Sequence, residues 1–289
     1  VDVVSNPEFL REGEAIRDFV YPDRVVIGTN SHKANRILKS LYLPIIKKTS
    51  RYFNTSRRGA ELIKYASNAF LATKISYINE LANLCEKTDV DIKDISFGMG
   101  LDQRIGERFL RAGPAYGGSC FPKDTRAIVD TAQKFKTDLS IIKQVIQSND
   151  ERKKLLTKKI EKIFKNKIKN KNITFLGVTF KPNTDDMREA SSLFMIPNLV
   201  KKGALIRYYD PTGKKEEFNN LKNVRSCKNI SDACNKSDMI IIHTEWNEFK
   251  LLNFKKLVKK NSFSIYDLRN LYSTSKMKKN KLKYYGVGR

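Results

Sequence analysis

The feature that most constrains the fold is the alternation of short apolar segments with helical segments after residue 172. The apolar segments are rich in Ile, Val, Phe and Tyr, a composition typical of buried strands. Strands that alternate with helices predict a parallel, doubly wound sheet, in which ligand sites lie at the carboxyl ends of the strands. The predicted strands cover residues 173–178, 205–209, 239–243, 264–266 and 282–287.

The first half of the chain is mainly helical. Ser56 is a suitable N-cap for a helical run that extends to about Lys87, and the middle of this run carries few charges. A Lys- and Asn-rich segment, residues 166–172, marks the boundary to the second half. We therefore predict an α/β chain with an all-helical domain at residues 31–168 and a Rossmann-like domain at residues 169–289.

A cysteine stands in the segment Gly-Gly-Ser-Cys-Phe-Pro-Lys-Asp, residues 117–124. The two glycines allow a tight turn and a close backbone approach, and Pro122 suits the first turn of a helix that begins at Lys123. Cys120 would then lie just before a helix N-terminus, where the helix dipole favours a thiolate. A lone cysteine is more often buried and structural, but these neighbours favour a reactive nucleophile, with Asp124 one helical turn away.

The composition excludes several functions. The 289 residues contain no apolar run of about 18 residues, which a membrane span requires. Four scattered cysteines without metal-ligand spacing predict no metal site and suit a reducing cytoplasm. The net charge of +25 could indicate a nucleic-acid binder, but the lysines fall on predicted helix faces and connectors and are not interleaved with aromatic residues. We therefore expect no nucleic-acid partner and no membrane partner.

The common signature motifs are missing from the sequence. Gly177 stands alone after the first predicted strand of the second half, so no G-x-G-x-x-G fingerprint occurs there. His32 and His243 are isolated and are expected to be surface or structural residues. Lys64 and Asn68 share one helix face. Such a lysine usually extends along apolar surface, but beside an asparagine and an anionic ligand it could act as an electrophile.

Five segments in a fixed order resemble the UDP-glucose 6-dehydrogenase family of nucleotide-sugar dehydrogenases. The resemblance extends over residues 6–269. The matching segments are NPEFLREG at 6–13, ELIKYASNAF at 61–70, DQRIG at 102–106, the cysteine segment at 117–124, and FKP with TDDMR within 180–188.

The resemblance implies a two-step, NAD-dependent oxidation of UDP-glucose to UDP-glucuronate. The Cys120 thiolate would capture the aldehyde as a thiohemiacetal, which is oxidised to a thioester and hydrolysed. Glu8 would act as the base for the hydrolytic water, with a pKa that burial could raise. Lys64 and Asn68 would stabilise oxyanions at C6, and Asp124 would position the water or the cysteine.

The resemblance also implies a set of binding residues and a homodimer formed through the long helix at residues 57–87. Arg104 would reach the site of the neighbouring subunit. Residues expected to contact the UDP-sugar are Glu8, Phe9, Leu10, Arg11, Lys64, Asn68, Arg104, Arg111, Tyr116, Gly117, Phe180, Lys181 and Arg269. Residues expected to face NAD are Glu12, Phe121, Pro122, Lys123 and Arg188.

One departure from the family pattern is the missing N-terminal G-x-G-x-x-G domain. Residues 1–30 would be the end of that NAD-binding domain together with a substrate loop, and residues 1–4 would form its final strand. We expect this polypeptide to lie inside a longer one and to be inactive alone. Two alternatives stay open, namely a GDP-mannose or other nucleotide-sugar 6-dehydrogenase, and a non-catalytic remnant that dimerises and binds UDP-sugars.

Overall fold

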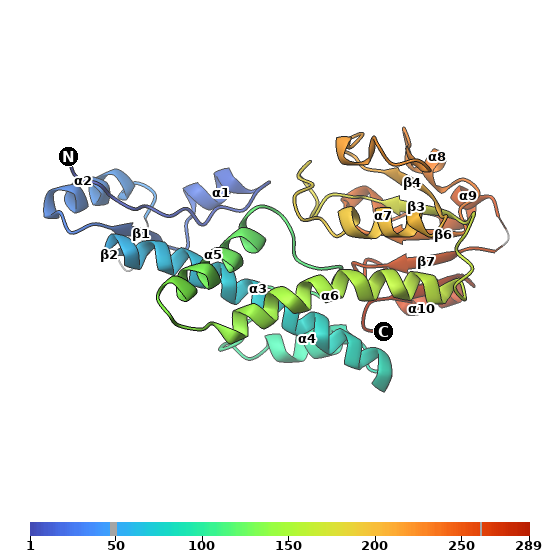
Figure 1. Ribbon diagram of the computed structural model, residues 1–289, viewed down its shortest axis with the longest axis horizontal. Coiled ribbons are helices and arrows are strands. Elements are labelled where there is room, and N and C mark those ends of the chain that lie inside the picture. Colours follow the sequence, from blue (N-terminus) through green and yellow to red (C-terminus); the bar gives the residue numbers. More distant parts are fainter. Residues whose placement is uncertain (47–50, 261) are drawn as a thin grey trace. The chain divides into compact units, whose positions relative to one another are not determined.

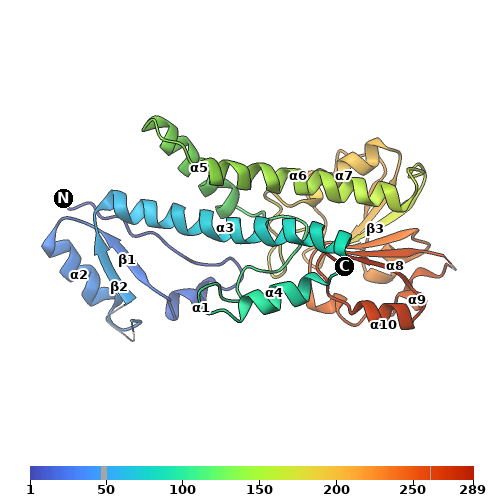
Figure 2. The same ribbon diagram turned by 90° about the horizontal axis from the view of Figure 1, so that it is seen from below.

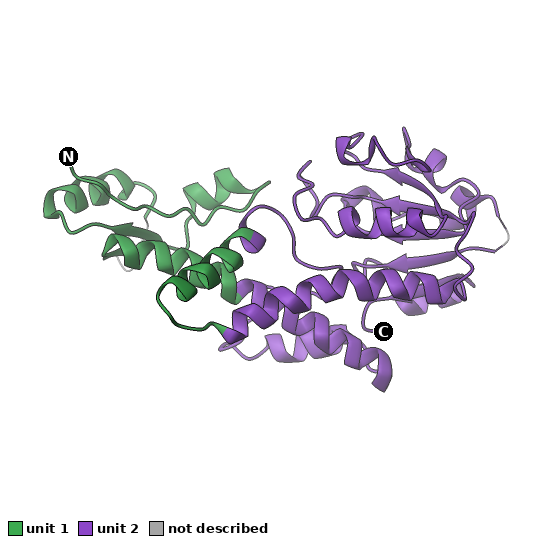
Figure 3. Cartoon of the chain, in the orientation of Figure 1, with its two compact units in different colours: residues 1–70, 123–139 green, residues 71–122, 140–289 purple. Residues whose placement is uncertain are grey.

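The computed structural model describes residues 1–46, 51–260 and 262–289 (Figure 1). These residues form two units (Figure 3). Unit 1 contains residues 1–70 and 123–139, and unit 2 contains residues 71–122 and 140–289. Among the described residues, none of the helices has the length and apolar character needed to cross a membrane.

Unit 2 contains a six-stranded parallel sheet with the strand order β5-β4-β3-β6-β7-β8. Counted from its first strand, this order is 3-2-1-4-5-6, the order of dinucleotide-binding Rossmann folds, so the predicted doubly wound sheet is confirmed. The order reverses between β3 and β6, where ligands bind in such sheets. The strands are β3 Asn172–Leu176, β4 Leu205–Tyr209, β5 Val224–Ser226, β6 Met239–Ile242, β7 Ser264–Asp267 and β8 Lys283–Gly286.

Helices cover both faces of this sheet (Figure 2). Alternate residues of one strand enter different cores, since Ile241 packs with α7 on one face and Ile240 packs with α8, α9 and α10 on the other. Burial on both faces explains why the central strands are continuous apolar runs. The helices are α7 Ser192–Lys201, α8 Ile230–Cys234, α9 Phe254–Val258 and α10 Thr274–Lys279, with single 3-10 turns at Glu216–Phe218 and Asn247–Phe249.

The core on the α7 face continues into long helices. Ile78 of α3 (Arg57–Thr88) and Leu156 of α6 (Ser140–Ile163) are fully buried in it, and Ile92 of α4 (Ile92–Gly100) is nearly so. Helices and sheet therefore share one hydrophobic core within unit 2. The domain boundaries expected at residues 30 and 168 stay predictions.

Unit 1 is built on two parallel strands, β1 Val25–Gly28 and β2 Tyr52–Thr55. Ser56 accepts a hydrogen bond from the N–H of Gly59 at 3.1 Å, so the predicted start of α3 is confirmed. The strand expected at residues 1–4 is wrong, because only Ser5 pairs, in one antiparallel bridge with Gly28. The remaining helices here are α1 Ala15–Val20, α2 His32–Tyr42 and most of α5 Cys120–Lys134.

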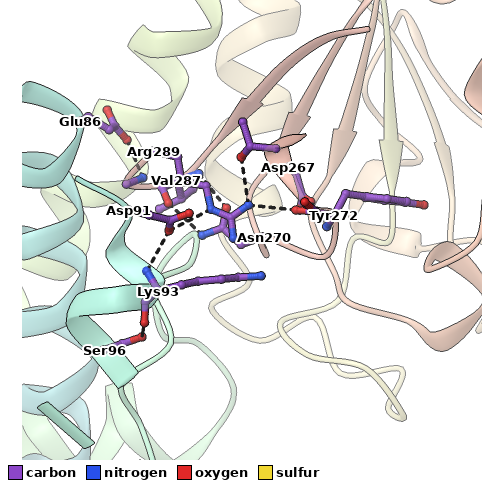
Figure 4. A network of polar contacts seen from close by, with 12 residues as sticks. Glu86, Asp91, Lys93, Ser96, Asp267, Asn270, Tyr272, Val287 and Arg289 are labelled. Atoms are coloured by element: carbon purple, nitrogen blue, oxygen red, sulfur yellow. Dashed lines mark hydrogen bonds and ion pairs between the residues drawn. The ribbon is translucent and has the colours of Figure 1, made fainter. Parts of the chain in front are cut away.

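The residues after β8 return to the helices within unit 2 (Figure 4). The N–H of Gly288 donates to Glu86 Oε1 at 3.0 Å, and its carbonyl accepts from the N–H of Ile92 at 2.9 Å. The buried Arg289 guanidinium pairs with Asp91, with Nε and Oδ1 3.2 Å apart. Gly288 has φ +69°, a conformation that favours glycine.

We expect Gly288→Ala to lower the free energy of unfolding by about 3 kcal/mol, from a strained φ and overpacking. An added Cβ would lie 2.7 Å from Ile92 Cβ and 2.8 Å from Ala82 Cβ. The matched control is Gly98→Ala, in α4, where a Cβ meets nothing within 4 Å. That change should instead stabilise the protein by about 1 kcal/mol. Urea unfolding followed by circular dichroism measures both, and equal effects would contradict the packing described.

Candidate active site

Cys120 is the first residue of α5, three residues earlier than the predicted helix start at Lys123. Its Sγ lies 3.6 Å from Ser119 Oγ. Of the four cysteines, all of which are described, Cys120 alone is not buried. Burial raises the pKa of the Cys227 thiol to about 11 and that of the Cys234 thiol to about 12. Since a thiolate is the reactive form, Cys120 is the best placed nucleophile.

The glycines before Cys120 permit a close contact with the loop that follows β3. A Cβ on Gly117 would lie 2.6 Å from the Glu189 carbonyl oxygen. A Cβ on Gly118, which has φ +80°, would lie 2.8 Å from the Phe180 ring. The N–H of Gly118 donates to the Arg188 carbonyl at 2.7 Å. The close backbone approach expected from the sequence is therefore present, and no larger side chain fits.

Arg269 connects the carboxyl ends of three strands in unit 2. It follows β7, and its Nε donates to the carbonyl of His243 after β6 at 2.7 Å. Its Nη2 donates to the carbonyl of Phe180 after β3, also at 2.7 Å. Glu245 neutralises the guanidinium, with Nε and Oε2 2.9 Å apart. Arg269 thus lies where the strand order reverses, as predicted for a ligand site.

Four other residues of unit 2 that are expected at the UDP-sugar site differ in their exposure and in their contacts. Lys181 Nζ lies 5.3 Å from the centre of the Phe180 ring. Arg104 is exposed and pairs with Asp102 at 2.6 Å, and Arg111 is also exposed. The Tyr116 ring is buried and packs with Phe121, Ala72 and Val145.

The residues expected to face NAD are divided between the units. Arg188 forms an ion pair with Asp186 at 2.8 Å, while 65% of its side chain stays exposed. Lys123 has 68% of its side chain exposed and lies 2.6 Å from Asp124. Unit 2 holds Phe121, Pro122 and Arg188, and unit 1 holds Glu12 and Lys123.

Glu8 and Lys64 come together in unit 1. Lys64 Nζ lies 2.8 Å from Glu8 Oε1 and also donates to the Glu8 carbonyl. The N–H of Leu10 donates to Glu8 Oε2 at 2.7 Å. Partial burial favours a higher pKa for Glu8, but the bonds from Lys64 and Leu10 outweigh it and the pKa lies below its usual value. The increase in the Glu8 pKa that burial could cause is therefore not present, because Lys64 and the Leu10 N–H stabilise the carboxylate.

Asn68 and Asp124 also meet in unit 1. Asn68 Nδ2 donates to Asp124 Oδ2 at 2.6 Å, and both side chains are buried. Phe9 lies under the Arg24 guanidinium, 4.0 Å from ring centre to Cζ. Arg11 is held by Asp18, with Nη2 and Oδ1 2.7 Å apart. Lys64 and Asn68 are thus four residues apart on α3, and the carboxylate of Asp124 on α5 contacts the amide.

His243 is fully buried, and its carbonyl accepts the bond from Arg269 Nε. Thr244 Oγ1 donates to the Thr179 carbonyl, so it accepts from His243 Nδ1–H at 3.1 Å. Ser191 Oγ then donates to the bare Nε2 at 2.7 Å. Burial and the Arg269 charge lower the pKa of His243 to about 3, so the ring is neutral and structural. The sequence offered one signal for this network, namely a histidine at the end of a predicted strand.

In the described ranges, no group of three or more His, Cys, Asp or Glu side chains is placed to hold a metal ion.

We expect His243 to make stability depend on pH. The unfolded chain binds a proton on this residue below about pH 6.5 and the folded protein does not, so stability falls as the pH drops from 6.5 towards 3. The loss should be about 2 kcal/mol between pH 6.5 and 5. In His243→Gln this part of the slope should vanish, whereas His32→Gln, at an exposed position, should retain it. Urea unfolding at several pH values tests this, and identical slopes in both variants would refute it.

The chain matches three parts of one family, the UDP-glucose/GDP-mannose dehydrogenase family. Its NAD binding domain matches residues 1–46, its central domain matches residues 58–151, and its UDP binding domain matches residues 174–274. UDP-glucose 6-dehydrogenase of Rickettsia typhi is 46% identical over 99% of this chain and 67% of that protein. The enzyme of the same name from Rhizobium meliloti is 43% identical over 100% of this chain and 67% of that protein.

Solved structures agree with these relatives. A UDP-glucose dehydrogenase from Pyrobaculum islandicum has a TM-score of 0.88 and 32% identity, and the match covers 99% of this chain. The chain spans 63% of the length of that structure and about two thirds of the curated relatives, between 65% and 67%. The resemblance inferred from the five sequence segments is confirmed, and the chain belongs to the UDP-glucose/GDP-mannose dehydrogenase family.

Proposed function

We propose that this protein is a UDP-glucose 6-dehydrogenase, which oxidises the C6 alcohol of UDP-glucose to a carboxylate with two equivalents of NAD+. The observation that carries the proposal is 46% identity to an enzyme of that name over 99% of the chain. The geometry supports it, since the one cysteine that is not buried begins α5 directly after a glycine turn. Such a thiol can hold an aldehyde until a second oxidation has occurred.

NAD+ accepts a hydride in each oxidation when it is bound. Strands β1 and β2 lie in or near the part that matches an NAD binding domain, residues 1–46. The sequence contains no G-x-G-x-x-G, so this chain does not supply the glycine turn that usually binds the pyrophosphate. The exposed side chains of Lys123 and Arg188 suit phosphate contacts, and with Glu12, Phe121 and Pro122 they are proposed to flank the cofactor.

The thiol carries the covalent part of the reaction. After the alcohol has lost a hydride and a proton, Cys120 Sγ adds to the C6 aldehyde and forms a C–S bond. Loss of a second hydride, to NAD+, and of the hydroxyl proton converts the thiohemiacetal to a thioester. Water then attacks C6, the C–S bond breaks, and the thiolate leaves with the carboxylate as product. Two oxidations thus occur without release of the aldehyde.

Four polar residues of unit 1 are proposed to assist. Lys64 and Asn68 would stabilise the oxygen at C6 as negative charge develops on it. Asp124 accepts from Asn68 Nδ2 at 2.6 Å, which fixes the amide with its donor group oriented. The lowered pKa keeps Glu8 ionised at neutral pH, as a base for the hydrolytic water must be, although a lower pKa makes a weaker base.

The nucleotide is proposed to bind at the carboxyl edge of the sheet. Phe180, Lys181 and Arg269 surround the point where the strand order reverses, and Gly117 approaches the same loop. This edge belongs to the part that matches a UDP binding domain. A solved structure of the same fold is a UDP-D-ManNAc dehydrogenase from Pyrococcus horikoshii. The identity of the sugar therefore needs a direct binding test. The remaining proposed contacts are Glu8, Phe9, Leu10, Arg11, Arg104, Arg111 and Tyr116.

In the full-length protein we expect Cys120→Ala to slow the second oxidation, and with it the formation of UDP-glucuronate, at least about a thousandfold, because the covalent step is lost. At most one NADH should then form per UDP-glucose. The wild type should form two NADH per UDP-glucose. Binding of UDP-glucose, measured by calorimetry, should be within threefold of the wild type in Cys120→Ala and lost in Lys181→Ala. Absorbance at the NADH wavelength measures the turnover.

GDP-mannose is the control ligand for this experiment. Tight binding of GDP-mannose and none of UDP-glucose would replace the proposed substrate with the alternative one. Selective UDP-glucose binding without any NADH would instead support the non-catalytic alternative.

We also propose a homodimer that forms through α3, and a cytoplasmic location suited to four free thiols. In unit 2, Tyr77 and Leu84 lie seven residues apart on one face of α3, with 50% and 57% of their surface exposed. In unit 1, the same helix exposes Leu62 and Phe70. Apolar side chains in this spacing are typical of helix pairing.

We expect Leu84→Asp to weaken the dimer by about tenfold or more, because a charge would be buried without a partner. The matched control is Leu251→Asp, since Leu251 is 89% exposed and lies outside α3. Sedimentation velocity over a range of concentrations gives the dimer dissociation constants. A monomeric wild type, or equal weakening by both substitutions, would refute this interface.

A further inference from the structure

The segment before the cysteine has its backbone held by side chains from two helices of unit 2. Asn149 of α6 makes two bonds to Tyr116, accepting from its N–H at 2.8 Å and donating to its carbonyl at 3.1 Å. Asn79 of α3 accepts from the N–H of Gly113 at 2.8 Å. Arg152 of α6 donates from Nε to the Gly113 carbonyl at 3.1 Å. Both polar groups of Gly113 and both of Tyr116 are therefore satisfied by side chains.

These three side chains are almost completely buried. Asn79 is 3% exposed, and Asn149 and Arg152 are each 4% exposed. Arg152 also connects the helices, since its Nη1 donates to the Asn79 carbonyl at 3.2 Å and to Asn83 Oδ1 at 2.6 Å. None of these bonds is to a carboxylate. Burial lowers the pKa of Arg152 and outweighs the charge of Glu86, which acts on the guanidinium in the opposite direction. A buried guanidinium whose hydrogen bonds all go to neutral groups costs free energy, so we ask what it holds in place.

What it holds is a segment with an unusual backbone. Ala115 has φ 153° and Gly118 has φ 80°, both outside the range that most residues adopt. Such conformations persist only where the surroundings determine them. On its other side the segment contacts the loop after β3, through the bond from the Gly118 N–H to the Arg188 carbonyl at 2.7 Å. The Tyr116 ring packs against Ala72 of α3 and Val145 of α6.

Residues 113–118 are therefore held by α3 and α6 on one side and by the loop after β3 on the other. The nucleophile follows this segment in the chain. A Cβ on Gly113 would lie 3.5 Å from Arg269 Nη1, so the anchored end also borders the proposed nucleotide site. Four residues after Tyr116 the chain reaches Cys120 and begins α5. Misplacement of a reacting atom by about 1 Å can cost roughly a hundredfold in rate.

We propose that Asn149 and Arg152, supported by Asn79, are positioning residues that hold residues 113–118 so that Cys120 Sγ is presented for attack. The proposal rests on the proposed function. The three residues touch neither the thiol nor the substrate in this role, and they act through the backbone of the segment. Their removal should lower the rate of the covalent step more than it lowers affinity for the sugar nucleotide.

The test uses Asn149→Ala in the full-length protein, which removes both bonds to Tyr116. We expect kcat to fall about a hundredfold, while the affinity for UDP-glucose from calorimetry falls by no more than about tenfold. The urea midpoint should also fall, because two buried backbone groups lose their partners, so the kinetics are measured well below that midpoint. Cys120 should be alkylated by iodoacetamide at least five times faster than in the wild type, because the segment is released. The matched control is Gln144→Ala, an exposed amide on the same helix, which should behave as the wild type does.

Alkylation of Cys120 requires no turnover, so it separates this proposal from the proposed function. Absence of NADH in the wild type would refute the dehydrogenase and leave the alkylation result to decide the positioning role. Unchanged alkylation and kcat in Asn149→Ala would overturn the proposal, and so would a loss of UDP-glucose affinity as large as the loss of kcat. If Asn149→Ala does not fold, Arg152→Lys takes its place, since it keeps the charge and loses the bonds that join the two helices, and the same outcomes apply.

Discussion

The approach of the Gly117-Gly118 backbone to the loop after β3 is the constraint on which the rest of unit 2 depends. A single Cβ at either position would lie 2.6 to 2.8 Å from the Glu189 carbonyl or the Phe180 ring. The two loops come from distant parts of the chain, so their contact requires the sheet, the shared core and helix α6 to be correctly placed together. The tightly packed hydrophobic core of unit 2 thereby fixes the position of the loop that leads to the Cys120 thiol.

The central strands could be predicted because burial on both faces makes each of them a continuous apolar run. β4 was predicted at its observed bounds, and β3 and β6 differ by two residues or fewer. β5, Val224–Ser226, was missed because a three-residue edge strand has no apolar run to detect. α10, Thr274–Lys279, was missed because its lysines are typical of a connector, and only Met277 enters the core. Short elements of this kind are defined by tertiary contacts and not by local pattern.

The candidate site likewise contains some residues that the sequence identified and others that it did not. Motif spacing and family resemblance gave Cys120, Glu8, Lys64, Asn68 and Asp124, and the structure pairs Glu8 with Lys64 and Asn68 with Asp124. The direction of the Glu8 pKa could not be predicted, because it depends on whether burial or the nearby cation dominates. Asn149 and Arg152 gave no signal, since polar residues on a helix usually face solvent. Their importance follows from a distant loop that needs hydrogen-bond partners.

The anchors of that loop show how stability and chemistry compete in this chain. Apolar residues of similar volume in place of a buried guanidinium often stabilise a protein, so Arg152 is not explained by stability alone. Its Nη2 has no hydrogen-bond partner among the described residues, and neither has the buried hydroxyl of Tyr266 nearby in the same core. A core optimised for stability would contain neither group. Such local costs are expected where a fold has to hold one strained segment in a single conformation, and here that segment leads to the thiol.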